Sequence, residues 1–254
     1  MLSFAGIRLL SFALLLAVAA PMAIASDAAA PFTTQAPPTY ILIGFVGGFV
    51  RHTNAHHGPV ILAKRLQQEA PKNSYIQIFE NRRRRAAYRT IVRLLDDNRD
   101  GLLNDQEKAG AHIILFGQSW GGSAAVLLAR DLERTGIPVL LTVQVDSVAK
   151  LWQNDGVIPD NVAAAANFYQ PHGIIHGRRL IKAEDDSRTQ ILGNYRFDYK
   201  QNPVRCEGYS WFDRFVTPSH MQSECDPKLW SEVENLMRRR MEMDPRNIAA
   251  NPTK

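Results

Sequence analysis

Ser119 lies between two glycines in the segment Gly117–Gly121, which reads Gly-Gln-Ser-Trp-Gly. The apolar run Ile113–Phe116 predicts a buried strand that leads into this segment, and a helical pattern begins just after Gly122. On a sharp turn between a strand and a helix, a serine is held in a strained conformation that exposes its hydroxyl above the strand ends. The segment therefore predicts that Ser119 is a nucleophile. The alternative is a tight glycine-rich turn that contains an incidental serine.

The wider run Leu115–Ala124 resembles the G-x-S-x-G-G turn of α/β-hydrolases, of lipases and esterases in particular. The resemblance extends in element order from about Tyr40 to the C-terminal helix. It implies a single α/β-hydrolase-like domain, with a mostly parallel sheet and helices on both faces. It also implies a serine hydrolase that cleaves a carboxylic ester through an acyl-enzyme intermediate. The substrate class would be a small-molecule or lipid ester, and no cofactor is required for this chemistry.

A nucleophilic serine needs a base, which in this superfamily is a histidine that follows the serine and the acid along the chain. Only three histidines follow Ser119: His172, His176 and His220. We predict His220 as the base, because it lies on a predicted loop before the last helix and between the two cysteines of the chain. His172 and His176 lie beside glycines and are equally compatible with turns, and His176 is the alternative base.

The acid that orients the base is predicted to be Asp146. It directly follows the predicted strand Pro138–Val145, and a carboxylate at the end of a buried strand is costly unless it has a partner. Loops at this edge of a parallel sheet are also where sites assemble. Many α/β-hydrolases carry the acid one strand later, where Asp198 is the candidate and Asp185 or Asp186 are further alternatives. The alternative role for Asp146 is to cap the following turn.

The oxyanion hole is expected to use the backbone N–H of Trp120, the residue after the nucleophile. A second donor normally comes from the loop after the first core strand, here Ile43–Gly48, which lacks the His-Gly start of many family members. Phe45 or Val46 could supply it, and we select Phe45. Three histidines follow and could line the cleft: His52, His56 and His57. They have no cysteine or carboxylate nearby in the sequence, which argues against a zinc site.

Residues 96–107 match the calcium-loop pattern D-x-[DN]-x-[DN]-G-x5-E at every position. The resemblance is to a single EF-hand-like loop inserted in the domain, and not to a paired calcium sensor. A structural calcium ion would be bound by these residues: Asp96, Asn98, Asp100, the Leu102 carbonyl and Glu107. The alternative is an acidic turn between a helix and a strand. If calcium binds, we expect it to stabilise this connection and to take no part in catalysis.

The elements that must position these residues alternate between strand and helix, which predicts a parallel sheet with helices on both faces. The predicted strands are Tyr40–Gly44, Ser74–Phe79, His112–Phe116, Pro138–Val145 and Thr189–Tyr195. The predicted helices run from Pro59 to just before Pro71, from Asn81 to Leu95, over Ser123–Arg134 and over Asp226–Arg239.

The N-terminal segment has the features of an export signal. Arg8 is the only charged side chain before the apolar run Leu9–Ala20, and the small residues Ala23–Ala25 follow as a cleavage site. We predict a signal peptide over residues 1–25, a flexible leader over 26–39 and the catalytic domain over 40–254. The protein is then secreted or periplasmic, with no stable membrane span after cleavage. An uncleaved anchor is the alternative.

Cys206 and Cys225 are the only two cysteines of the chain. In an oxidising compartment an isolated pair is usually bonded, so we predict a disulfide between them. Two unrelated buried thiols are the alternative.

The net charge of +5 raises the question of a nucleic-acid partner. The basic residues cluster in Arg82–Arg85 and Arg238–Arg240, inside helical patterns without interleaved aromatic residues, so we interpret them as solvated helix faces.

Three alternatives to an ester hydrolase remain open. The fold could serve a non-catalytic, calcium-stabilised binding protein. The same site could also act on a thioester or lactone, or on a peptide.

Overall fold

The computed structural model describes residues 39–71, 73–110, 112–207 and 217–244, which all belong to one compact unit. The predicted signal peptide and all of the predicted leader except its last residue lie outside the described residues. Within the described ranges, no helix is long and apolar enough to cross a membrane.

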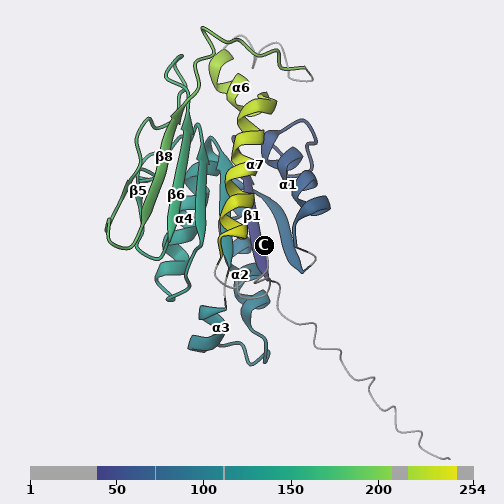
Figure 1. The fold of residues 1–254 in the computed structure, drawn as a ribbon, viewed down its shortest axis with the longest axis vertical. Helices are drawn as coiled ribbons and strands as arrows, with labels where there is room; N and C mark the ends of the chain where they lie inside the picture. The colour runs from purple at the N-terminus through teal and green to yellow at the C-terminus, as the bar shows by residue number, and fades with distance from the viewer. Residues whose placement is uncertain (1–38, 72, 111, 208–216, 245–254) are drawn as a thin grey trace, which may run out of the picture. The chain divides into compact units, whose positions relative to one another are not determined.

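Six parallel strands form the central sheet, in the order β2-β1-β3-β4-β6-β8 (Figure 1). They are β1 (Tyr40–Val46), β2 (Ser74–Glu80), β3 (Ile113–Gln118), β4 (Leu141–Val145), β6 (Ala164–Tyr169) and β8 (Gln190–Arg196). Two short strands, β5 (Val157–Ile158) and β7 (Lys182–Ala183), pair separately. The chain crosses over between neighbouring parallel strands, as βαβ units require.

Helices cover both faces of this sheet, because successive side chains of each buried strand point to opposite sides. Tyr40 and Leu42 of β1 pack into the core beneath α1 (Gly58–Glu69) and α7 (Pro227–Glu242). Ile41 and Ile43 point to the other core, beneath α2 (Arg84–Leu95) and α4 (Trp120–Glu133). Figure 1 shows α1 and α7 in front of the sheet and α4 behind it. The predicted fold class, a mostly parallel sheet with helices on both faces, is confirmed.

Two elements that the prediction missed bear on the site. The buried strand β6, which reads Ala-Ala-Ala-Asn-Phe-Tyr, lies between β4 and β8, and its small side chains carry little hydrophobic signal in the sequence. The second is α6 (Pro218–Cys225), where a loop was predicted. Its sequence, Pro-Ser-His-Met-Gln-Ser-Glu-Cys, has Pro218 in the first turn, which suits a helix start, but no regular apolar stripe.

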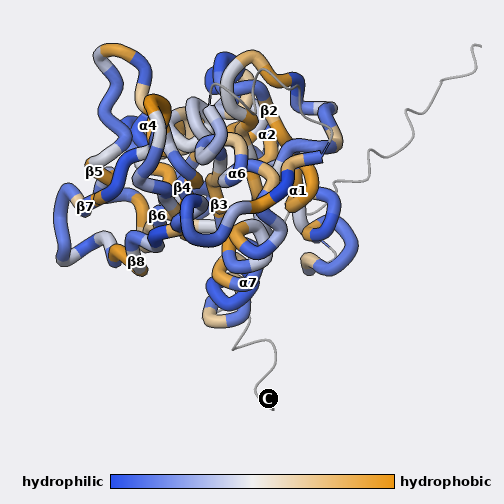
Figure 2. Tube along the Cα trace, turned by 90° about the horizontal axis from the view of Figure 1, so that it is seen from above, coloured by the Kyte–Doolittle hydropathy of each residue, from blue (hydrophilic) through white to orange (hydrophobic). Residues whose placement is uncertain are grey.

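Because the sheet strands are parallel, their carboxyl ends meet at a single edge, where ligands of open α/β sheets bind. The loops after β1, β4 and β6 gather there, and α6 lies above this edge (Figure 1). In the view from above, hydrophobic and hydrophilic stretches alternate along the loops around α6 (Figure 2).

Candidate active site

Ser119 occupies the sharp turn between β3 and α4, with φ 56° and ψ −127°. A positive φ is costly for a residue with a side chain, so the surrounding structure must hold it in place. The Ser119 N–H donates to the carbonyl of Val145 at 3.0 Å, which ties the turn to the neighbouring strand. The helix begins directly at Trp120 and not after Gly122 as predicted, because the two glycines form part of its first turn.

The flanking glycines allow this turn to close against the sheet. A Cβ atom at Gly117 would lie 2.3 Å from the carbonyl oxygen of Gly121. A Cβ at Gly121 would lie 2.3 Å from the carbonyl oxygen of Phe45. Both neighbours are backbone atoms that cannot move aside, so any side chain at either position would displace the strand, the helix or Ser119.

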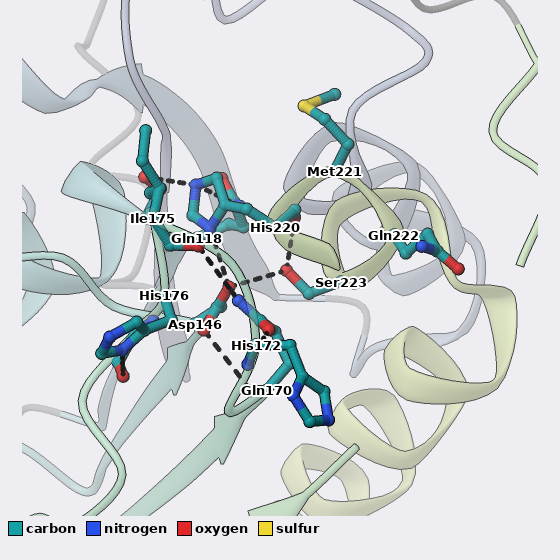
Figure 3. Close-up of polar contacts among 12 residues, drawn as sticks. Gln118, Asp146, Gln170, His172, Ile175, His176, His220, Met221, Gln222 and Ser223 are labelled. Atoms are coloured by element: carbon teal, nitrogen blue, oxygen red, sulfur yellow. Dashed lines mark hydrogen bonds and ion pairs between the residues drawn. The ribbon is translucent and has the colours of Figure 1, made fainter. Parts of the chain in front are cut away.

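His220 and Asp146 complete a line of hydrogen-bonded groups that starts at Ser119. His220 Nε2 lies 2.9 Å from Ser119 Oγ, and His220 Nδ1 lies 2.7 Å from Asp146 Oδ2. Ser119 and His220 are each 8% exposed and Asp146 is fully buried, so water competes little for these bonds. Figure 3 shows His220 with its ring directed at Asp146. His220 belongs to α6 and not to a loop, which corrects the predicted element.

Asp146 is held by several donors besides His220. Its Oδ1 accepts the backbone N–H of Gly177 at 2.5 Å, and its Oδ2 accepts Nε2 of Gln170 at 2.9 Å (Figure 3). Ser223 Oγ lies 3.4 Å from the same Oδ2. These donors offset the desolvation of a buried carboxylate and fix its orientation toward the imidazole.

The alternative acids and bases lie elsewhere. His172 Nε2 pairs with Asp198 Oδ1 at 3.0 Å, and Arg196 donates to the same carboxylate. Burial opposes the charge of Asp198, but hydrogen bonds from Arg196 and His172 hold its pKa below the ordinary value. His176 lines the same pocket as Ser119, but its Nδ1 lies 3.3 Å from the carbonyl oxygen of Gly177. Asp185 and Asp186 occupy the turn before β8. Among the described residues, the line of hydrogen bonds from Ser119 therefore runs through His220 to Asp146 and through none of these alternatives.

A pocket of about 710 Å³ opens beside Ser119 and His220. Much of its wall is apolar: Phe49, Val50, Trp120, Val148, Ile174, Ile175 and Met221. Two of these side chains stand in solvent at the rim, where Phe49 is 83% and Ile174 is 92% exposed. The Phe49 ring meets the Trp120 ring edge-on at 5.4 Å between centroids. The pocket thus offers an apolar volume directly next to the serine hydroxyl.

The two predicted oxyanion donors occupy different surroundings. Trp120 is the first residue of α4, where a backbone N–H is not used by the helix itself, and it lines the pocket. Phe45 lies inside β1, paired with both neighbouring strands and fully buried. Gly47 and Gly48 line the pocket instead, and a Cβ at Gly47 would lie 2.9 Å from Ser119 Cβ. The geometry favours this glycine pair over Phe45.

Asn81 holds the glycine loop in place, a role that sequence reasoning missed. It was predicted only as the start of a helix, but its Nδ2 donates to the carbonyls of Gly48 at 2.6 Å and Val46 at 3.3 Å. Lys150 Nζ donates to Asn81 Oδ1 at 2.7 Å and lies 4.6 Å from the centre of the Trp120 ring. A long-range contact of this kind leaves no pattern in the sequence.

The three histidines after the glycine loop differ in their surroundings. His52 pairs with Glu80 at the end of β2, at 2.7 Å between Nδ1 and Oε1. Burial would raise the pKa of Glu80, but hydrogen bonds from His52 and from the Glu80 backbone outweigh it and lower that pKa to about 2. His56 is exposed, whereas His57 is buried, lines the pocket and contacts Glu224 of α6.

The acidic loop of residues 96–107 is stabilised by its own backbone. Asp96 Oδ2 accepts the Gly101 N–H at 3.0 Å. At the start of α3 (Asp105–Ala109), Glu107 Oε2 accepts the Asn104 N–H at 2.9 Å. The all-oxygen donor set suits calcium. However, the described part of the chain holds no group of three His, Cys, Asp or Glu side chains arranged to bind a metal ion. Calcium binding therefore stays a prediction.

Cys206 and Cys225 form a disulfide, as predicted, with their Cα atoms 5.6 Å apart. Cys225 is the last residue of α6, five residues after His220. The bond therefore fastens the helix that carries the imidazole to the segment that follows β8.

No protein-family model matches the chain, and no curated protein matches it either. Among solved structures, the chain is similar to a cutinase-like protein from Cryptococcus sp., at 12% identity and a TM-score of 0.42 over 81% of this chain and 96% of that one. It is also similar to the RedJ thioesterase of the prodiginine biosynthetic pathway in Streptomyces coelicolor, at 11% identity and a TM-score of 0.36 over 80% and 97%. An acetyl xylan esterase matches at 10% identity and a TM-score of 0.30 over 78% and 98%. Likeness at this level carries no conclusion about the chemistry of this chain.

Proposed function

We propose that the protein is a serine hydrolase that cleaves a carboxylic ester. The observation that supports this most is the unbroken line from Ser119 Oγ through His220 to Asp146, at 2.9 and 2.7 Å. These are the distances that transfer of a proton from the hydroxyl to the imidazole requires. A binding protein would have no use for a serine in a strained turn with a buried base and acid behind it.

In the proposed reaction, Ser119 Oγ attacks the ester carbonyl while His220 Nε2 takes the hydroxyl proton. The carbonyl π electrons move to the oxygen, which is stabilised by the N–H of Trp120 and by N–H groups of the Gly47-Gly48 loop. When the tetrahedral intermediate collapses, the bond to the alcohol breaks and the imidazolium protonates the departing oxygen. Water, activated by the same imidazole, then cleaves the acyl-enzyme and releases the acid. Asp146 stabilises the imidazolium and keeps its tautomer.

The substrate proposed for this site is an ester with an apolar acyl group. Much of the pocket wall is apolar, and its 710 Å³ volume can hold a small organic group. Thioesters and lactones present the same carbonyl chemistry, so a panel of activated esters, thioesters and lactones with matched acyl groups separates these alternatives. We further propose that the protein is exported, because a disulfide persists in an oxidising compartment.

The direct test uses a fluorophosphonate probe, which reacts with activated serines. We expect the probe to label the wild type at Ser119 and to leave Ser119→Ala unlabelled. His220→Ala should lower turnover of a p-nitrophenyl ester by at least about 1,000-fold with an unchanged circular dichroism spectrum. His172→Ala, in the loop after β6, is the matched control and should retain turnover. A folded wild type that is neither labelled nor active across the panel would falsify the proposal.

A further inference from the structure

A second buried histidine–carboxylate pair lines the same pocket as Ser119. His57 precedes α1 as its N-cap residue, and Glu224 lies in α6. His57 Nδ1 contacts Glu224 Oε1, and the two residues are only 6% and 4% exposed. Among the described residues, His57 is the basic side chain that lies within salt-bridge distance of Glu224. The proposed reaction assigns no role to this pair.

The pair is coupled to the proposed base through the geometry of α6. Glu224 follows His220 by four residues, so the two side chains lie on the same face of the helix, one turn apart. Both line the pocket. A charge on Glu224 that lacks compensation would therefore act on the His220 imidazole across one helical turn.

Trp230 of α7 links the start of α1 to the end of α6. The Glu224 carbonyl accepts the Trp230 indole N–H at 2.8 Å. A Cβ atom on Gly58, the residue after His57, would lie 2.0 Å from the same indole ring. The start of α1 is thus packed against Trp230 of α7, whose indole N–H also holds the Glu224 carbonyl, and His57 and Glu224 meet beside this contact.

The helix that carries His220 depends on such anchors. It has only eight residues, too few for a helix to be stable on its own. On one side, the Cys206–Cys225 disulfide and a hydrogen bond from Val204 N to Gln222 Oε1 at 2.6 Å hold it. On the side that faces the pocket, the contact of Glu224 with His57 holds it.

We propose that His57 and Glu224 form a positioning pair for the base His220. The pair fixes α6 against the start of α1, and it neutralises the Glu224 carboxylate so that Asp146 is the anion that acts on the imidazole. Neither residue is proposed to touch the reacting atoms. This inference rests on the proposed hydrolase function of Ser119.

The test compares His57→Gln, Glu224→Gln and the double variant, with His56→Gln as the control at the exposed neighbouring histidine. His57→Gln leaves the Glu224 carboxylate without its imidazole partner and so favours protonated, inactive His220. In the pH profile of kcat/KM for p-nitrophenyl acetate, we expect the acidic limb to move to higher pH by about 0.5 to 2 units. Glu224→Gln should lower kcat about 3- to 30-fold with KM nearly unchanged, and without the upward movement. The double variant should return the acid limb to its wild-type position.

A purely structural role would lower the melting temperature of these variants without moving the acid limb or separating kcat from KM. Acid limbs and kcat values equal to those of His56→Gln in all three variants would overturn the inference. Should His57→Gln fail to fold, Glu224→Gln and the double variant still decide, because neither buries an unpaired carboxylate at position 224. Fluorophosphonate labelling of the wild type separates this failure from failure of the proposed function: a labelled wild type with unaffected variants refutes only the positioning pair.

Discussion

Replacing Asp146 with asparagine changes one buried atom and, by our reasoning, should disable the site. Each carboxylate oxygen of Asp146 faces donors. Oδ1 accepts from Gly177 at 2.5 Å, and Oδ2 faces His220 at 2.7 Å and Gln170 at 2.9 Å. An asparagine can present an oxygen to only one of these sets, and its NH2 group must face the other.

The two orientations of the new amide have different costs. If its NH2 faces His220, the imidazole must accept at Nδ1, so Nε2 carries the proton and cannot accept one from Ser119. If its NH2 faces Gly177, two N–H groups oppose each other in a buried site, which costs about 1–3 kcal/mol. In both orientations the negative charge that stabilises the imidazolium is gone. We expect kcat to fall about 1,000- to 10,000-fold, equivalent to about 4–5.5 kcal/mol of transition-state stabilisation.

The assay is turnover of a p-nitrophenyl ester by Asp146→Asn beside Asp198→Asn. Asp198 is a suitable control because its carboxylate also pairs with a histidine, His172, but it does not belong to the hydrogen-bonded line from Ser119 through His220 to Asp146. We expect Asp198→Asn to retain turnover within about threefold of the wild type. Urea titrations give the stability of both variants, so a loss of rate is separated from a loss of fold. The reasoning is refuted if Asp146→Asn keeps more than a tenth of the wild-type kcat, or if Asp198→Asn loses as much.

Three further predictions concern stability. The pKa of Glu80 lies at about 2 against an ordinary 4.5, so its contribution to the free energy of unfolding is complete above pH 4.5 and is lost as the pH falls toward 2. Urea titrations should show Glu80→Gln about 1–2 kcal/mol less stable at pH 7, with a flatter dependence below pH 4.5; an unchanged slope there contradicts this. The double variant Cys206→Ser/Cys225→Ser should lose about 3 kcal/mol of stability. Its turnover should also fall, because the disulfide fastens the helix that carries His220. Millimolar calcium should raise the melting temperature of the wild type but not of Glu107→Gln, with turnover unchanged, and no rise in the wild type refutes the calcium prediction.

The nucleophile turn was predictable from sequence because its determinants are local. An apolar strand, a serine between glycines and a helical pattern are all contained within about 20 consecutive residues. Glycine is required at 117 and 121 because a Cβ atom at either position would lie 2.3 Å from a backbone carbonyl oxygen. Most strands of the sheet were likewise predictable, because their buried runs are continuous and apolar. β6 was missed because three of its six residues are alanine.

Predicting the partners of Ser119 required the order of residues along the chain as well as local patterns. Asp146 could be identified because a charge at the end of a buried strand demands a partner. His220 could be identified only as one of three histidines, and its helix was not predicted. The reason is that α6 is held by a disulfide and by long-range contacts and not by an apolar stripe.

Sequence alone thus predicted the candidate nucleophile, the parallel α/β architecture and the pairing of the two cysteines, all of which follow from short-range patterns or simple counts. The tertiary structure decided which carboxylate faces which imidazole. It placed Asp198 with His172 and Asp146 with His220, and it set the Gly47-Gly48 loop rather than Phe45 beside the serine. It alone brought His57 to Glu224, 167 residues away. Such contacts join side chains from distant strand ends, and their energy depends on three-dimensional burial and orientation, which leave no periodic trace along the chain.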